Sequence, residues 1–430
     1  MKIYMWLFLC VIFGGSLVFA ESEEAIVFGI SNEEVGIEPM KIYVGMVALL
    51  ATQHKKIEVF LEDVRQKLSF GSRFSVCAEI RTSLPKKKSQ IRELFERGFD
   101  AALLISISED DSNSVDWRLY DTDGGTMVQG RKLLCSSLRD TAAQIAVRVI
   151  EALVAQVPPF LTKIAFVERK AREKGSILWL TDVQGQEHTV LYDSSRILVS
   201  PSWGKPAPRQ FIAISEFTPH NVRFVGIDMH GRRYRLLDRD GTSVGICYDQ
   251  ESDRVVYAHS GAIWQLQFNG ATNLWEHRCI PGITGTCGTP VLGPGGGVFY
   301  CSNGNICFYD VKKMASEMIT SKGYHVAPTY STQGNRLVFA SKDKETMQLQ
   351  EFDLVRRTLR PITQGVGIKT DPTLSPCGRY CGYCFQVGCS SVIRVRDLLT
   401  GEDWQVSQPG VYAQFPSWSP YLQSTDIAHG

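Results

Sequence analysis

The sequence has almost no net charge, few histidines and, after its first twenty residues, no long apolar run. Its 430 residues include 46 basic and 45 acidic side chains, which gives a formal net charge of +1. Because the two signs are interspersed, the sequence offers no basic surface for nucleic acid or for an anionic membrane. We also expect no membrane span after residue 20, since no later stretch is long and apolar enough to cross a bilayer.

Histidine and cysteine chemistry are both weakly supported. The eight histidines are scattered, without the paired spacing that metal ligands need. Cys377, Cys381 and Cys384 have the spacing of an iron–sulfur site, and Cys389 could complete a four-cysteine metal site. However, Cys381 and Cys384 fall at opposite parity in one predicted strand, so their sulfurs should point to opposite faces of the sheet. We therefore expect no metal, cluster or other cofactor.

A disulfide is a separate question. Removal of the first twenty residues would leave eleven of the twelve cysteines, so at least one is unpaired within the chain. Cys301 and Cys307 flank a turn and are the nearest candidates for a bridge. The alternative is that the cysteines in apolar strands are buried thiols.

The first twenty residues have the pattern of an export signal. Lys2 is the only charge, residues 3–13 are apolar, glycines follow at 14–15, and residues 18–20 end in the small side chain of Ala20. The alternative is an uncleaved anchor, because residues 3–20 approach membrane-spanning length. We expect cleavage after Ala20 and an exported, soluble product.

The next segment, residues 21–32, is first acidic and then apolar. It is either an ordinary first strand or a segment that detaches and pairs with a partner. The residues that would make such a contact are Glu21, Glu23, Glu24, Ile26, Val27 and Phe28.

Residues 21–156 predict a small α/β domain. Helical stripes are formed by Ile57, Phe60, Leu61, Val64 and Leu68, by Ile91, Leu94 and Phe95, and by Leu138, Ala142, Ile145, Val149 and Leu153. Strands are expected at 74–80, 101–107, 115–121 and 127–134, with the last two joined as a hairpin by the turn at 121–125. Two prolines then stiffen a linker at 157–162.

From residue 163 onward a short phrase recurs. It reads FPSWSP at 415–420, VSPSWG at 199–204, APTYS at 327–331 and DPTLSP at 371–376, with a weaker echo at 289–292. Pro328, Pro372 and Pro416 are spaced by 44 residues (372−328=44 and 416−372=44). A period in the forties that carries short strands is typical of β-propeller blades.

The arrangement of the repeats predicts how the ring closes. Three strands at 164–167, 177–182 and 187–191 have no phrase before them, while the last phrase at 415–419 has no strands after it. We therefore predict that the C-terminal strand is the innermost strand of the first blade. It would close an all-β six-bladed propeller over residues 163–430.

One motif of serine hydrolases also occurs. Residues 241–245 read GTSVG, which matches the nucleophile elbow. That elbow needs a strand before the serine and a helix after it, whereas here another strand follows. We therefore expect no catalysis. The alternative, a propeller-containing serine hydrolase, requires a hydrolase domain that the residues outside the propeller are too few to form.

The chain resembles the TolB family of the Tol–Pal envelope system. The resemblance rests on the ending FPSWSPYL at 415–422, on FLTKIAFV at 160–167, and on the repeat at 372–378; residues 98–102 and 119–122 match more loosely. The aspartate usual in the repeat turn is replaced by Gln333, Cys377 or Tyr421, and the second and third blades have nearly lost the motif.

The resemblance implies a non-catalytic periplasmic adaptor that supports outer-membrane integrity and envelope constriction during cell division. A Pal-like lipoprotein would bind at the propeller mouth, and a TolA-like inner-membrane protein would bind the mature N-terminal segment. The mouth should be built from loops just before each anchor proline, which supply Thr242, Thr289, His325, Val326, Lys369, Asp371 and Gln414. A third hypothesis, in which the protein is an outer-membrane assembly scaffold, would need a propeller of eight blades.

Overall fold

The computed structural model describes residues 38–47, 54–71, 73–108, 114–135, 137–170, 175–204, 210–237, 240–249, 254–269, 274–283, 287–343 and 345–422. The predicted signal segment and the predicted partner-binding residues at 21–28 lie outside these ranges. Within them, no helix combines the length and the apolar character needed to cross a membrane.

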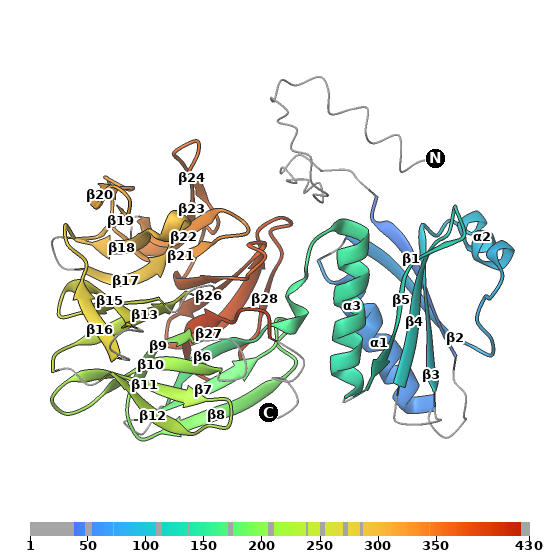
Figure 1. The fold of residues 1–430 in the computed structure, drawn as a ribbon, viewed down its shortest axis with the longest axis horizontal. Helices are drawn as coiled ribbons and strands as arrows, with labels where there is room; N and C mark the ends of the chain where they lie inside the picture. The colour runs from blue at the N-terminus through green and yellow to red at the C-terminus, as the bar shows by residue number, and fades with distance from the viewer. Residues whose placement is uncertain are drawn as a thin grey trace. The chain divides into compact units, whose positions relative to one another are not determined.

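The first part of the described chain is a mixed five-stranded sheet with three helices, here called the α/β region (Figure 1). Its elements are β1 (Met40–Val47), α1 (His54–Ser69), β2 (Phe74–Arg81), α2 (Lys88–Glu96), β3 (Ala101–Ser108), β4 (Ser114–Asp121), β5 (Thr126–Leu134) and α3 (Leu138–Val154). The strand order is β2-β1-β3-β4-β5, with β1 parallel to both neighbours and β3, β4 and β5 antiparallel. The predicted hairpin is confirmed.

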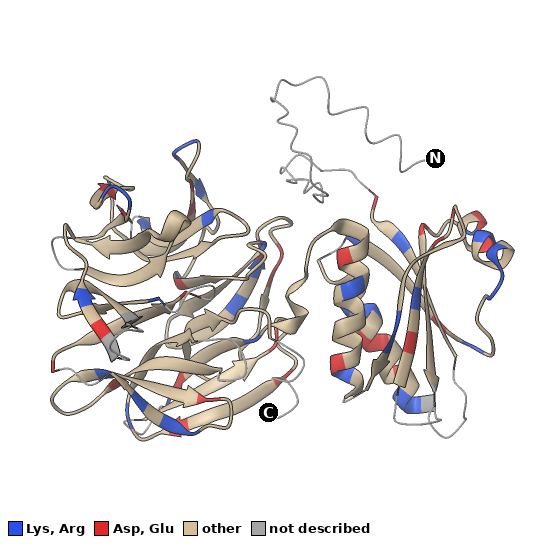
Figure 2. Cartoon of the chain, in the orientation of Figure 1, with Lys and Arg blue, Asp and Glu red and all other residues tan. Residues whose placement is uncertain are grey.

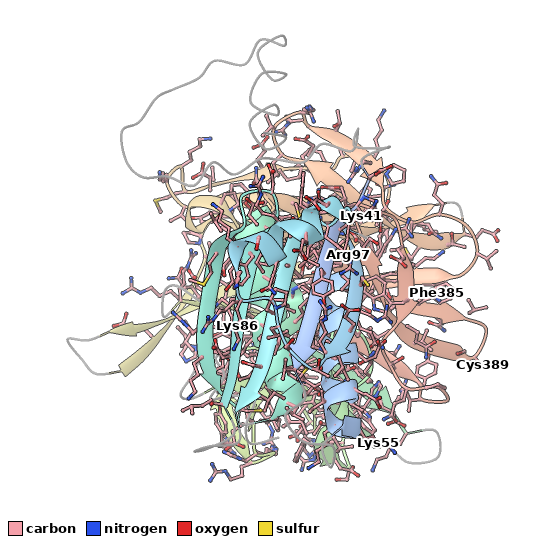
Figure 3. All side chains as sticks on the ribbon, turned by 90° about the vertical axis from the view of Figure 1, so that its right-hand side faces the viewer. Lys41, Lys55, Lys86, Arg97, Phe385 and Cys389 are labelled. Atoms are coloured by element: carbon pink, nitrogen blue, oxygen red, sulfur yellow. The ribbon has the colours of Figure 1, made fainter. Side chains whose placement is uncertain are left out.

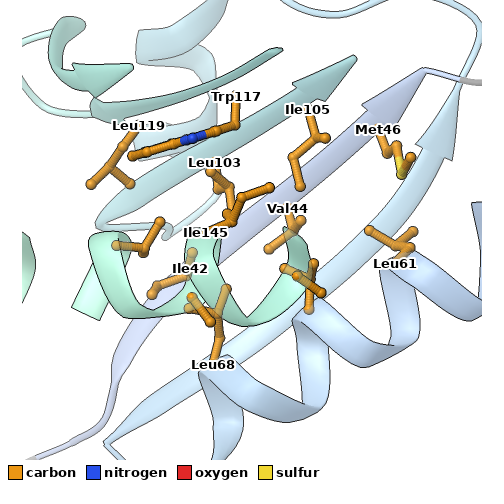
Figure 4. Close-up of a cluster of buried hydrophobic side chains, with 14 of the residues drawn as sticks. Ile42, Val44, Met46, Leu61, Leu68, Leu103, Ile105, Trp117, Leu119 and Ile145 are labelled. Atoms are coloured by element: carbon orange, nitrogen blue, oxygen red, sulfur yellow. The ribbon is translucent and has the colours of Figure 1, made fainter. Parts of the chain in front are cut away.

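Helices α1 and α3 bury their apolar stripes against one face of this sheet (Figure 4). All five predicted residues of the α1 stripe are buried, as are Ala142, Ile145 and Val149 of α3. In α2, Ile91 and Leu94 are buried, but Phe95 is 40% exposed, so its placement in the buried stripe is wrong. Phe95 lies at one edge of the stripe, on the side of Ile91 away from Leu94, in the last turn of the helix.

Strand β1 lies between β2 and β3, and the sequence patterns do not predict it. Ile42, Tyr43, Val44 and Met46 are all fully buried, because α1 and α3 cover one face and α2 covers the other. On the α2 face, the Arg97 guanidinium lies 5.8 Å from the ring centre of Tyr43. Figure 3 labels Arg97 on this part of the α/β region. A strand buried on both faces has a continuous apolar run without the alternation that marks half-buried strands.

The rest of the chain forms six four-stranded antiparallel sheets arranged as a propeller. After the short 3-10 helix η3 (Pro159–Leu161), the strands are β6 (Ile164–Arg169), β7 (Ser176–Thr181), β8 (His188–Ser194), β9 (Leu198–Trp203), β10 (Phe211–Phe217), β11 (Val222–Asp228), β12 (Arg233–Leu237), β13 (Ser243–Tyr248), β14 (Val255–His259), β15 (Ala262–Asn269), β16 (Leu274–Cys279), β17 (Cys287–Leu292), β18 (Val298–Ser302), β19 (Asn305–Asp310), β20 (Ala315–Met318), β21 (His325–Ser331), β22 (Arg336–Asp343), β23 (Thr346–Asp353), β24 (Thr358–Pro361), β25 (Ile368–Leu374), β26 (Tyr380–Val387), β27 (Ser390–Asp397), β28 (Asp403–Gln405) and β29 (Ala413–Trp418).

The predicted closure by the C-terminal strand is confirmed. Strand β29 pairs with β6, so the first blade has the order β29-β6-β7-β8. The innermost strands contact one another in the cyclic order β9, β13, β17, β21, β25, β29 and back to β9. The count of six blades also removes the eight-bladed alternative.

Charged residues of both signs are interspersed along the α/β region and the propeller (Figure 2). Many of them are paired: Glu216, for example, accepts hydrogen bonds from Arg196, Arg223 and Arg233 at 2.7–3.2 Å. These contacts hold the pKa of the Glu216 carboxyl below its usual range although burial opposes the shift. The negative charge of Glu216 is therefore paired with arginines of the propeller.

Candidate partner-binding site

Each innermost strand contains one residue in the left-handed backbone conformation. These residues are Ser200 (φ 52°), Gly245 (φ 66°), Thr289 (φ 46°), Ala327 (φ 52°), Asp371 (φ 51°) and Phe415 (φ 54°). The pairing with the next strand shifts register at the same place in every blade, which is the mark of a β-bulge. The repeat is therefore present in all six blades as backbone geometry.

The third blade shows why the sequence phrase could fade there. Five of the six left-handed residues precede a buried proline, whereas Gly245 precedes the buried Ile246. Glycine adopts positive φ without a steric penalty, so this blade keeps the bulge without the usual residues. The bulges lie in the innermost strands, which contact one another around the ring, and they are next to the predicted mouth residues.

Two kinds of loop meet at one end of the blades, here called the propeller mouth. One kind connects each blade to the next innermost strand, and the other joins the second and third strands counted from the inside. They are hydrogen-bonded to each other: Lys342 N donates to Tyr324 O at 2.8 Å, and Phe217 N donates to Ile197 O at 2.9 Å. In these two blades the two kinds of mouth loop are therefore fixed to each other by backbone hydrogen bonds.

Lys369 is buried and holds one mouth loop in place through hydrogen bonds. Its Nζ donates to the carbonyl oxygens of Val366 at 2.6 Å, Gln364 at 3.2 Å and Gly365 at 3.4 Å. Burial lowers the pKa of the Lys369 ammonium. This lysine therefore holds the loop in shape and does not present its charge to a partner.

His325 is also buried and has a structural environment. Its Nε2 lies 2.6 Å from the carbonyl oxygen of Lys322, and its ring centre lies 5.3 Å from that of Phe339. A carbonyl only accepts, so Nε2 carries the proton, while Nδ1 has no hydrogen-bond partner among the described residues. His325 fixes the start of β21 in the same way that Lys369 fixes the start of β25.

Asp371 and Thr289 are two of the left-handed residues. Thr370 Oγ1 donates to Asp371 Oδ2 at 3.0 Å, yet burial raises the pKa of the Asp371 carboxyl. The Thr289 hydroxyl is buried and has no hydrogen-bond partner among the described residues. Both side chains therefore lie at the bulges as buried polar groups.

Of the other three predicted mouth residues, Thr242 is exposed, whereas Val326 and Gln414 are partly buried. Thr242 forms an isolated bridge with Val222, Val326 packs at the edge of a blade core, and Gln414 pairs with Val167. Six of the seven predicted residues thus lie within the first four residues of an innermost strand, and Thr242 directly precedes one. Their role in partner binding stays a prediction.

Sequence reasoning missed the residues that the mouth exposes most. Tyr324 and Val387 are exposed, and Val366 is 82% exposed at the tip of the loop that Lys369 holds. Val366 lies between Gly365 and Gly367, both at positive φ. A valine between two glycines could have predicted this exposure from the sequence, because a tight turn leaves its central side chain pointing outward.

The GTSVG motif has no accessible nucleophile. Ser243 is the first residue of β13, and no helix follows it, as expected. Its Oγ lies 2.8 Å from His259 Nδ1, but both residues are buried. A substrate could reach Ser243 only if the blade opened, so this pair does not form the exposed elbow of a hydrolase.

The cysteine predictions have mixed outcomes. Cys381 and Cys384 belong to different cores, which confirms that they point to opposite faces of β26. The Cys301–Cys307 bridge is wrong, since both thiols are free. Cys301 is opposite Ile306 and Cys307 is opposite Tyr300, so the two sulfurs also lie on opposite faces of their hairpin.

The fold defines a chain with an α/β region followed by a six-bladed propeller. The sequence matches no family model. The structure is similar to that of TolB from Acinetobacter baumannii, with a TM-score of 0.73 and 16% identity over 89% of this chain and 97% of that chain. This likeness shows a shared fold across both parts of the chain.

Two further solved structures overlap less of the chain. A putative TolB from Agrobacterium tumefaciens covers 57% of this chain and 88% of its own at 13% identity, with a TM-score of 0.45. A chain of a nidogen/laminin complex covers 61% of this chain and 100% of its own at 10% identity, with a TM-score of 0.49. At these TM-scores the likeness is too loose to support a conclusion about this chain.

Proposed function

We propose that this protein is a non-catalytic periplasmic adaptor that acts as the TolB-type component of a Tol–Pal-type system. It binds a Pal-like lipoprotein at the propeller mouth and a TolA-like inner-membrane protein through residues 21–28. In this role it supports outer-membrane integrity and envelope constriction during cell division. The observation that carries the proposal is the likeness to TolB from Acinetobacter baumannii over both the α/β region and the propeller.

The properties of the mouth are consistent with a protein partner. Tyr324, Val366 and Val387 are exposed apolar or aromatic side chains at the propeller mouth, and the backbone of Tyr324 accepts a hydrogen bond from Lys342 N. Such side chains supply binding energy when a partner buries them, and a loop held by hydrogen bonds loses little conformational entropy on binding. Lys369 contributes by holding the Val366 loop in one conformation.

The first experiment is a calorimetric titration of residues 21–430 with the periplasmic domain of the Pal-like lipoprotein from the same organism. Val366→Asp should weaken binding at least about tenfold, because it places a charge where an apolar contact is expected. The matched control is Val355→Asp, since Val355 is also 82% exposed but lies in the β23–β24 turn at the other end of the blade.

Three outcomes separate the possibilities. Weaker binding by the Val366 variant alone supports the mouth as the binding site. Equal weakening by both variants contradicts that location, and no binding by the folded parent protein contradicts a Pal-like partner. Deletion of residues 21–28 should abolish binding of the TolA-like protein while leaving the Pal titration unchanged; loss of both would contradict two separate sites.

A further inference from the structure

Strand β5 is an edge strand with an unpaired outer side. Among the described residues it pairs only with β4, and it is nine residues long. Its side chains Met127, Val128 and Leu134 are exposed. A long edge strand with apolar side chains presents free backbone groups to which another extended segment can add.

A groove of about 500 Å³ lies beside this edge. Its sheet side is formed by Trp117, Gln129, Arg131 and Leu133, and its helix side includes Val147 and Arg148 of α3. Trp117 pairs with Arg131 across β4 and β5, so alternate side chains of β5 face the groove. Tyr421 and Leu422 also line it, and its volume is within the range of ligand-binding pockets.

The polar groups of the groove favour an acidic ligand. The Trp117 side chain is fully buried, and its indole N–H has no acceptor among the described residues. The groove lining also includes the Glu151 carboxylate, which is paired with Arg148 at 3.3 Å. Arg131 is exposed and forms no ion pair among the described residues. Strand β5 contains Arg131 and Lys132 but no carboxylate. The groove thus combines an unused donor, an unpaired guanidinium and an apolar floor.

We propose that the groove and the free edge of β5 together bind an extended segment of a partner protein. The segment adds as a sixth strand beside β5, and its alternate side chains enter the groove. One of these is a carboxylate beside Arg131, and its neighbours two residues away are aliphatic and contact Leu133. This surface is distinct from the propeller mouth and from residues 21–28, so its test does not depend on the function proposed above.

The probe is a fluorescein-labelled heptapeptide, Thr-Ile-Thr-Glu-Thr-Ile-Thr, whose isoleucines and glutamate share one side of a strand. Binding to residues 21–430 is measured by fluorescence polarisation. Two control peptides carry glutamine in place of glutamate, or N-methyl groups that prevent strand addition. Each should bind at least about fivefold more weakly, since one lacks the charge for Arg131 and the other lacks backbone donors.

A matched pair of protein variants tests the location. Arg131→Glu should weaken binding about tenfold or more, while Lys132→Glu, the adjacent residue on the opposite face, should change it less than about twofold. Trp117→Phe keeps an aromatic ring but removes the N–H, and should weaken binding about threefold to tenfold. Circular dichroism confirms that each variant is folded.

Two results would overturn the proposal. One is the absence of saturable binding of the glutamate peptide at millimolar concentration by the folded parent protein. The other is equal weakening by Arg131→Glu and Lys132→Glu, which would indicate a general electrostatic effect and no use of the groove.

Discussion

Replacing Trp418 tests whether closure by β29 stabilises the propeller. The side chain is only 6% exposed and packs in the core that β29 shares with β6 and β26. Its indole Nε1 donates to Thr162 Oγ1 at 2.8 Å, and its backbone N donates to Thr373 Oγ1 at 2.9 Å. One residue therefore connects the last strand to the start of the first blade and to the neighbouring blade.

The magnitude follows from the size of the buried ring. Truncating a buried tryptophan to alanine costs about 3–5 kcal/mol, because the contacts are lost and a cavity remains. For a propeller of this size, each kcal/mol lowers the melting temperature by roughly 2–3 °C. Trp418→Ala should therefore lower it by roughly 6–15 °C. Trp418→Phe retains most of the packing and should lose only about 1 kcal/mol with the N–H bond.

Differential scanning calorimetry on residues 21–430 measures both variants, with Val355→Ala as the exposed control. The expected order of melting temperatures is parent and Val355→Ala together, then Trp418→Phe, then Trp418→Ala. A Trp418→Ala shift no larger than that of Val355→Ala would refute the conclusion that the closing strand stabilises the ring. Removal of residues 413–430 should have a larger effect than any of these substitutions, because it also exposes the edge of β6.

Asp371→Asn should raise the melting temperature at neutral pH, because burial raises the pKa of Asp371 and its ionisation then disfavours the folded state. Since the folded pKa lies above the unfolded value, the stabilisation from this group is present at acidic pH and is lost as the pH rises through the folded pKa. Thermal melts from about pH 4 to 8 should thus show a growing advantage of the variant, and a constant difference would contradict this. Gly245→Ala should lower the free energy of unfolding by about 1–2 kcal/mol in urea titrations, because φ is 66° and a Cβ would lie 3.2 Å from Thr289 Cα. Ala327→Gly, at the equivalent position, should not lower it, and the same loss in both would argue against backbone strain. Alkylation in denaturant without reductant should label Cys301 and Cys307 separately; a peptide linked between them would contradict their placement on opposite faces.

The sequence predicts the propeller well because its repeat is a long-range pattern. The spacing of Pro328, Pro372 and Pro416 gives the blade length, and the unmatched last phrase gives the closure with β6. Strand β1 escapes prediction because Ile42 and Val44 face one core while Tyr43 faces the other. Burial on both faces removes the period of two on which strand prediction depends.

The candidate site is predicted less completely. Its predicted residues are found within or directly before the first four residues of innermost strands, but position in a repeat does not determine whether a side chain points outward. Lys369 and His325 turn inward to hold loop carbonyls, while the exposed position belongs to Val366. The bulge at Gly245 is likewise recognisable only from the backbone, since no proline marks it.

The pairing of Trp418 with Ile164 also has a consequence for folding kinetics. These residues are 254 positions apart in sequence (418−164=254), whereas every other pairing within a blade joins strands that follow one another. The entropy of closing so long a loop opposes early pairing of β29, so we expect the first blade to be completed last. Once the ring is closed, the same strand must leave before the blades can separate, and the departure of β29 then sets the rate of unfolding.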